Sequence, residues 1–146
     1  YCHESSIDGE CLRIAILGCN LEALSQAHTT FDTTPSASIT IYTGDAEAGF
    51  SEKPFEPIIL KNLLDTLPST WYGSIPMSID QKNPSSTSTS WLCKALAIRL
   101  AERGAQFLLH TNIIDVDEEI QEISFRGGGA IPSGTHRYDQ LYDFRQ

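Results

Sequence analysis

The stretch "IAILGCNLEALSQA", residues 14–27, constrains the fold of this chain more than any other part of the sequence. Residues 12–17 form a short apolar run of the kind found in strands that are buried on both faces. Gly18 permits a sharp turn, and apolar side chains then recur at helical spacing as far as Phe31. A second strand, rich in β-branched residues, is predicted at residues 38–43. A strand, a helix and a strand within about 30 residues predict a right-handed βαβ unit with two parallel strands.

The second half of the chain extends the sheet. A helix is predicted at residues 91–103, where apolar positions recur and Gly104 provides a stop, and a strand follows at residues 106–111. We expect the strands at 12–17, 38–43 and 106–111 to be adjacent and parallel, with the first of them in the centre.

The last part of the sequence predicts antiparallel pairing. Residues 114–117 and 120–125 have the pattern of two arms of a hairpin, the glycines at 127–129 force another reversal, and residues 137–144 form the last strand. The predicted fold class is therefore α/β: a Rossmann-like parallel sheet with flanking helices plus an antiparallel β-meander.

The length of 146 residues predicts one domain. We expect residues 1–11 to be a flexible N-terminal arm and residues 12–146 to form the domain. A short helix is predicted at residues 57–67, before Pro68. The polar run "NPSSTSTS", residues 83–90, is expected to be a mobile loop that connects two elements.

The charge of the chain excludes several kinds of partner. Ten basic and nineteen acidic side chains give a formal net charge of −9, which argues against nucleic acids and anionic membranes because both require clustered Lys and Arg. No apolar run approaches the roughly 18 residues that span a bilayer. The four cysteines match no zinc pattern, so no metal site is predicted, and nothing resembles a secreted disulfide scaffold. We therefore expect a cytoplasmic protein.

Two segments in order carry a family resemblance. The βαβ start and the later segment "CKALAIRLAERGAQFLLHTNIIDVDEE" resemble FAD-dependent oxidoreductases of the glutathione-reductase-like and amine-oxidase-like kind. In that family a helix ending in glycine is followed by a strand and an antiparallel β-meander. The resemblance implies an FAD/NAD(P)-binding Rossmann-like domain.

The dinucleotide fingerprint G-x-G-x-x-G of this family falls on residues 18–23. Gly18 retains the first glycine of the tight turn, and Ala23 is an accepted small residue at the third position. Cys19 lies between them and is expected to pack behind the turn. Asn20 replaces the second glycine, which lets the backbone approach the pyrophosphate. Asn adopts positive φ more readily than most residues, so the turn can survive while the close approach is lost.

Other positions implied by the resemblance also differ from the family pattern. Glu22 places a carboxylate in the first helical turn, where a phosphate would otherwise be attracted. The acidic residue that binds the adenosine ribose in the family is replaced by Thr43, with Asp45 two residues later. By alignment, Ile113 occupies the position whose backbone meets the adenine.

These differences predict weak binding of FAD, or its loss, and make NAD(P) the less favoured ligand. Family members continue into a substrate domain and a Gly-Asp motif that holds the flavin, and only Arg145 and Gln146 follow Phe144. The chain is therefore expected to be a truncated or degenerate domain of a flavin-dependent oxidoreductase, with no activity of its own and with a C-terminal domain as a missing partner. The alternative is a cofactor-free Rossmann-like scaffold that binds a protein partner.

No other catalytic constellation is evident. The four histidines are scattered, and His28, on the apolar side of the first helix, is expected to be a hydrogen-bonded structural residue. His110, at a strand end, has the same expectation. No serine has the G-x-S-x-G context of a nucleophile elbow. The catalytic residues are not identified by the sequence.

Overall fold

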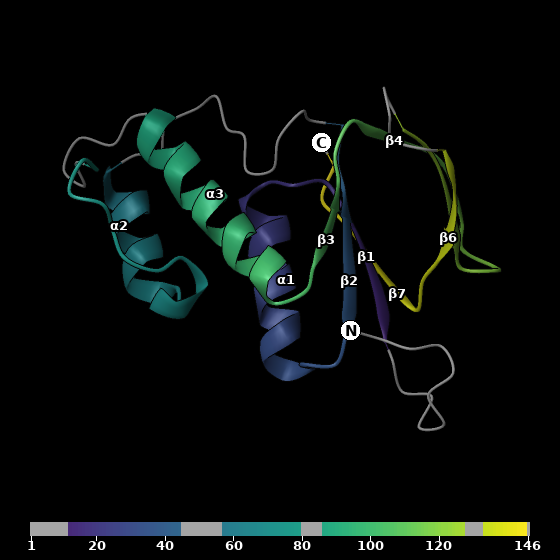
Figure 1. Ribbon diagram of the computed structural model, residues 1–146, viewed down its shortest axis with the longest axis horizontal. Coiled ribbons are helices and arrows are strands. Elements are labelled where there is room, and N and C mark those ends of the chain that lie inside the picture. Colours follow the sequence, from purple (N-terminus) through teal and green to yellow (C-terminus); the bar gives the residue numbers. More distant parts are fainter. Residues whose placement is uncertain (1–11, 45–56, 80–85, 128–132, 146) are drawn as a thin grey trace.

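The chain forms a four-stranded parallel sheet at the centre of the molecule (Figure 1). The computed structural model describes residues 12–44, 57–79, 86–127 and 133–145, with side chains from Lys61 and from Ser90 onward in the second and third ranges. The strand order is β3-β2-β1-β7. The bounds of these strands are Arg13–Leu17 for β1, Ser38–Tyr42 for β2, Gln106–Leu108 for β3 and Gln140–Asp143 for β7.

The parallel pairing of β1 and β2 confirms the predicted βαβ unit. Their register runs from Arg13 opposite Ser38 to Leu17 opposite Tyr42. The predicted central place of β1 among the first three strands is wrong, because β3 pairs with β2 and not with β1. β1 is an interior strand only because β7 covers its other edge.

The final strand also differs from the prediction. Residues 137–144 do not form one strand: β6 (Gly134–Arg137) ends where the prediction begins, and β7 is a separate strand of the parallel sheet. The break lies at Asp139, whose N–H donates to the Arg13 carbonyl at 2.7 Å and whose carboxylate binds the Arg13 guanidinium. These contacts turn the chain out of the meander and beside β1.

The helices cover one face of the parallel sheet. Helix α1 (Leu21–Thr33) and helix α3 (Ser86–Glu102) pack on it, and α2 (Pro57–Thr66) and the short 3-10 helix η1 (Ser69–Trp71) lie beyond α3 (Figure 1). The predicted helices at 57–67 and 91–103 are thus present. Residues 86–90 belong to α3, which corrects the prediction of a loop there, and residues 83–85 lie outside the described parts of the chain.

The meander covers the other face of the parallel sheet. Strands β4 (Thr111–Asp117), β5 (Glu122–Gly127) and β6 form an antiparallel sheet in that order, which confirms the predicted hairpin. The residues of the glycine run after Gly127 lie outside the described parts. A second core fills the space between the sheets; its fully or nearly buried members are Ala15, Leu17, Tyr42, Ile123, Phe125 and Tyr138.

The predicted structural role of His28 is confirmed. Its ring is 0 % exposed, stacks on Trp71 at 5.0 Å between centroids, and contacts the Leu96 carbonyl through Nε2 at 3.0 Å. Arg103 donates to His28 Nδ1 at 3.0 Å and also binds Asp32 at 2.6 Å. The network joins α1, α3 and η1.

None of the helices in the described ranges is long and apolar enough to cross a membrane.

Candidate functional site

A cavity of about 540 Å³ opens at the carboxyl ends of β1 and β2. This is where open α/β sheets bind ligands. The chain crosses from β1 to β2 on one side of β1 and returns from the meander to β7 on the other side. Four segments line the cavity, at residues 18–20, 42–44, 111–113 and 144–145. The first segment is the turn into α1, the second follows β2, the third begins β4, and the fourth follows β7.

Gly18 forms the turn for two separate reasons. Its φ of +102° lies in a region that side-chain-bearing residues rarely adopt. A Cβ at this position would also lie 3.3 Å from the carbonyl carbon and oxygen of Phe144. The Gly18 N–H donates to the Tyr42 carbonyl at 2.8 Å, which holds the turn against the end of β2. The sequence identified the first reason and not the second.

Asn20 is the N-cap of α1. Its φ is −86°, so the prediction that Asn is accommodated here through positive φ is wrong. The side-chain Oδ1 accepts the Ala23 N–H at 2.9 Å, and Nδ2 donates to the Phe144 carbonyl at 2.9 Å. The side chain thus satisfies one of the free N–H groups at the start of the helix and ties the turn to the end of β7. A pyrophosphate at this turn would compete with both bonds.

The other predicted site residues are distributed as follows. Thr43 is 5 % exposed, and its backbone joins β2 to the β3–β4 connection through the Leu108 carbonyl and the Thr111 N–H. Ile113 lines the cavity from β4 and is half-buried. Ala23 is fully buried behind the turn, as a packing residue, and Asp45 lies outside the described residues.

Cys19 lines the cavity and is 6 % exposed. Cys93, from α3, is a buried free cysteine, and burial raises its pKa to about 11. A thiol in such surroundings is inert at neutral pH. Cys93 therefore serves packing rather than chemistry.

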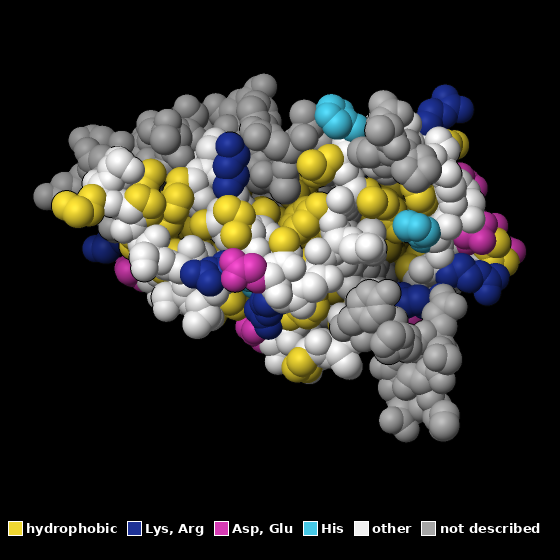
Figure 2. Space-filling model, in the orientation of Figure 1, with side chains coloured by type: hydrophobic (Ala, Val, Ile, Leu, Met, Phe, Trp, Pro, Cys, Tyr) yellow, Lys and Arg dark blue, Asp and Glu magenta, His cyan; other side chains and the backbone are white. Residues whose placement is uncertain are grey.

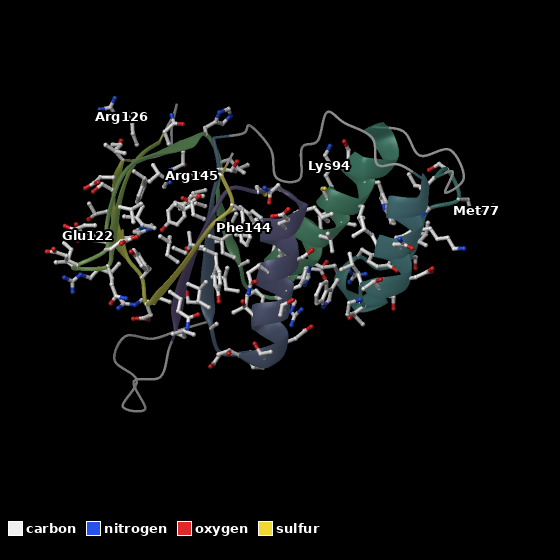
Figure 3. All side chains as sticks on the ribbon, turned by 180° about the vertical axis from the view of Figure 1, so that it is seen from behind. Met77, Lys94, Glu122, Arg126, Phe144 and Arg145 are labelled. Atoms are coloured by element: carbon white, nitrogen blue, oxygen red, sulfur yellow. The ribbon has the colours of Figure 1, made fainter. Side chains whose placement is uncertain are left out.

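Arg145 supplies the one guanidinium among the described residues that line the cavity. Arg145 directly follows Phe144 after β7 (Figure 3). Its Nε and Nη2 atoms donate to the two carboxylate oxygens of Asp143 at 2.9 and 2.8 Å. This pairing lowers the pKa of Asp143 and raises that of Arg145. Glu22 is exposed in the first turn of α1. The cavity mouth thus carries paired charges rather than a strong field of either sign.

The sequence did not identify six of the lining residues: Tyr42 and Gly44, which flank the predicted Thr43, and Thr111, Asn112, Phe144 and Arg145. No local pattern could have identified the last two, because they reach the turn only through the parallel return of β7 beside β1. Thr111 and Asn112 directly precede Ile113. The family alignment that selected Ile113 could therefore have identified these two neighbours as well. The described residues contain no group of three or more metal-ligating side chains.

No protein-family model and no curated protein matches this sequence. Solved structures with a similar fold include a pyridine nucleotide-disulfide family oxidoreductase from Enterococcus faecalis V583, at a TM-score of 0.54 and 17 % identity. A water-forming NADH oxidase from Lactobacillus brevis gives 0.56 and 13 %, and an NAD-dependent persulfide reductase from A. fulgidus gives 0.56 and 13 %. Each match covers 90 % of this chain, and covers 22 %, 24 % and 20 % of those chains.

The chain therefore has the α/β, Rossmann-like fold that occurs in FAD- and NAD(P)-dependent oxidoreductases, as the sequence resemblance implied. It spans less than a quarter of the length of the first of these structures. At such identities the likeness establishes the fold alone, and the ligand has to be argued from the cavity.

Proposed function

We propose that this chain is an FAD/NAD(P)-binding-type domain of, or derived from, a flavin-dependent oxidoreductase, and that its cavity receives the adenosine diphosphate end of the dinucleotide. One observation carries the proposal. Gly18, Cys19, Asn20, Thr43 and Ile113, which the fingerprint and the alignment select from three distant parts of the sequence, line one cavity at the carboxyl ends of the parallel strands.

The cavity offers groups that suit a diphosphate and an adenosine. The start of α1 has N–H groups without intrahelical acceptors, and its dipole favours an anion. Arg145 adds a guanidinium. The polar side chains of Thr43 and Asn112 suit a ribose, and Ile113 offers an apolar contact for a base. FAD when bound supplies electron-transfer chemistry at its flavin ring, and residues of this chain hold only the opposite end.

Two features weaken this binding in the isolated chain. Asn20 occupies the Ala23 N–H and bonds Phe144, and Glu22 places a carboxylate at the helix start. We expect micromolar or poorer affinity for FAD, and weaker affinity for NAD and NADP. The same Asn20 bonds favour a second candidate, a cofactor-free scaffold, because they stabilise the turn without a ligand.

Calorimetric titration with FAD, NAD and NADP, together with the visible absorbance of the purified protein, tests the proposal. Asn20→Gly with Glu22→Ala should improve FAD affinity, since it frees an N–H group and removes like-charge repulsion. Glu119→Ala, which removes a carboxylate in the β4–β5 turn, is the matched control and should change nothing. Tight FAD binding by the unaltered chain would contradict the prediction that the chain binds FAD weakly. Undetectable binding by the double variant would favour the scaffold.

A further inference from the structure

A second groove, of about 410 Å³, lies between the parallel sheet and strand β6. It is lined by the first residues of β1 and β2, by Gln106 at the start of β3, by residues 135–138, and by Tyr42, which also borders the dinucleotide cavity. It therefore lies toward the amino ends of the strands, whereas the dinucleotide cavity lies at their carboxyl ends. Charged side chains of both signs and a histidine gather over the meander end of the molecule in Figure 2.

The sheet face that forms the floor of this groove is unusually polar. Side chains of a strand alternate between faces, and Ala15, Leu17 and Tyr42 pack in the core under the meander. Alternation therefore puts Arg13 and Thr40 on that same face. Ser38 and Gln106 share it; Ser38 is opposite Arg13, and Gln106 is opposite Thr40 in the register. Parallel strands covered on both sides normally carry apolar residues on both faces.

These polar side chains have spare hydrogen-bonding capacity. Within the described parts of the chain, the side chains of Ser38, Thr40 and Gln106 make no hydrogen bond to another protein group. Ser38 and Thr40 are partly shielded, with intermediate exposure, and Gln106 is exposed at the start of β3. This row of hydroxyl and amide groups can bind a polar ligand, because its members are not part of either hydrophobic core.

The wall opposite this floor supplies donors. His136 is on the inner face of β6, because it pairs with the buried Ile123, and its Nδ1 lies 2.8 Å from the Tyr42 hydroxyl. Burial raises the pKa of Tyr42, so the hydroxyl keeps its proton. The contact with Tyr42 uses only Nδ1 of His136, which leaves the other ring nitrogen for a ligand.

The charges of the groove favour an anion. Arg13 and Arg137 line it, and none of the described residues that line it is acidic. Arg13 uses Nε and Nη2 to bind Asp139 at the margin, and Arg137 reaches the rim from the outer face of β6, opposite Glu122 in the register. Asp139 pairs with Arg13, so the guanidinium of Arg137 supplies the positive charge that the groove offers to an anion.

We propose that this groove binds a small organic phosphate: the Arg137 guanidinium and the His136 ring hold the phosphate, and the hydroxyl and amide groups of the sheet face hold a polar carbon skeleton. Phosphate suits fixed guanidinium donors, and a polyhydroxyl skeleton suits Ser38, Thr40 and Gln106. The groove exceeds what one inorganic phosphate fills, so the organic part contributes to recognition. This proposal is independent of the dinucleotide cavity.

Calorimetric titration of the whole chain with glycerol phosphate tests the proposal. Arg137→Gln should weaken binding by about tenfold, the loss expected for one charge-assisted hydrogen bond. Thr40→Val, which keeps the shape and removes the hydroxyl, should weaken it by about fivefold. Arg126→Gln removes the same charge from β5, outside the groove, and should leave the affinity unchanged (Figure 3).

Two further arms separate the possible outcomes. Asn20→Asp adds a negative charge to the dinucleotide cavity and should not alter glycerol phosphate binding. If Asn20→Asp abolishes that binding while Arg137→Gln leaves it unchanged, the phosphate occupies the dinucleotide cavity and the proposal is wrong. Inorganic phosphate should bind more weakly than glycerol phosphate. Equal affinity for the two, equal losses in Arg137→Gln and Arg126→Gln, or no measurable heat would also overturn the assignment.

Discussion

Acidification below neutral pH should destabilise this fold through His28. The ring is completely buried, and Arg103 donates to its Nδ1, so the proton resides on Nε2 and is donated to the Leu96 carbonyl. Protonating Nδ1 would break the Arg103 bond and place two cations side by side. Burial is the largest cause of the lowered pKa of His28, which falls from 6.5 to about 4, and Arg103 lowers it further, whereas the Leu96 and Asp32 interactions raise it.

The size and sign of the effect follow from this shift. The unfolded chain takes up a proton near pH 6.5, and the folded chain only near pH 4, so acid favours unfolding. The stability is complete above the unfolded pKa and is lost progressively as the pH falls toward 4. At pH 5 the loss from this group is about 2 kcal/mol, and it reaches roughly 3 kcal/mol below pH 4.

Urea unfolding measured between about pH 5 and pH 8 checks this prediction, in a range where the paired aspartates stay ionised. His28→Gln should lower the stability at pH 8 and remove most of the dependence on pH. The control variant is His110→Asn, which replaces an exposed histidine. Asparagine tolerates the φ of +49° at this position, so the variant should keep the dependence of stability on pH. The pKa of His136 is also lowered by burial, so His136→Gln should remove a smaller part. A full pH dependence in His28→Gln would refute the reasoning.

Two further substitutions test the turn at the start of α1. Gly18→Ala should lower the free energy of unfolding by more than about 1 kcal/mol, because the positive φ alone costs that amount and the new Cβ would press on the Phe144 backbone; an unchanged urea midpoint would contradict it. Glu22→Gln should lower stability by roughly 0.3–1 kcal/mol at low ionic strength, with a smaller loss at high salt, because Glu22 interacts with the helix dipole. A melting temperature above that of the parent without ligand would exclude this role, and a rise that appears only with excess FAD would favour dinucleotide binding.

The sequence determined the elements that depend on local patterning. Apolar runs and helical spacing placed β1, α1 and β2, and the parallel pairing of β1 with β2 followed from the short crossover. The hairpin of β4 and β5 was predicted for the same reason, since its two arms are neighbours in sequence. His28 was assigned to the core from its place on the apolar side of a helix.

The tertiary structure alone decided where distant segments meet. β7 returns beside β1 because Asp139 binds Arg13 from 126 residues away, and no local pattern records that pairing. That return places the Phe144 carbonyl against Gly18 and Asn20. Asn20, which the sequence shows only as a departure from the fingerprint, therefore caps α1 and joins the turn to the end of β7. The groove beside β6 arises in the same way: alternation is visible in each strand, but only the packing of the meander decides which part of a sheet face stays uncovered.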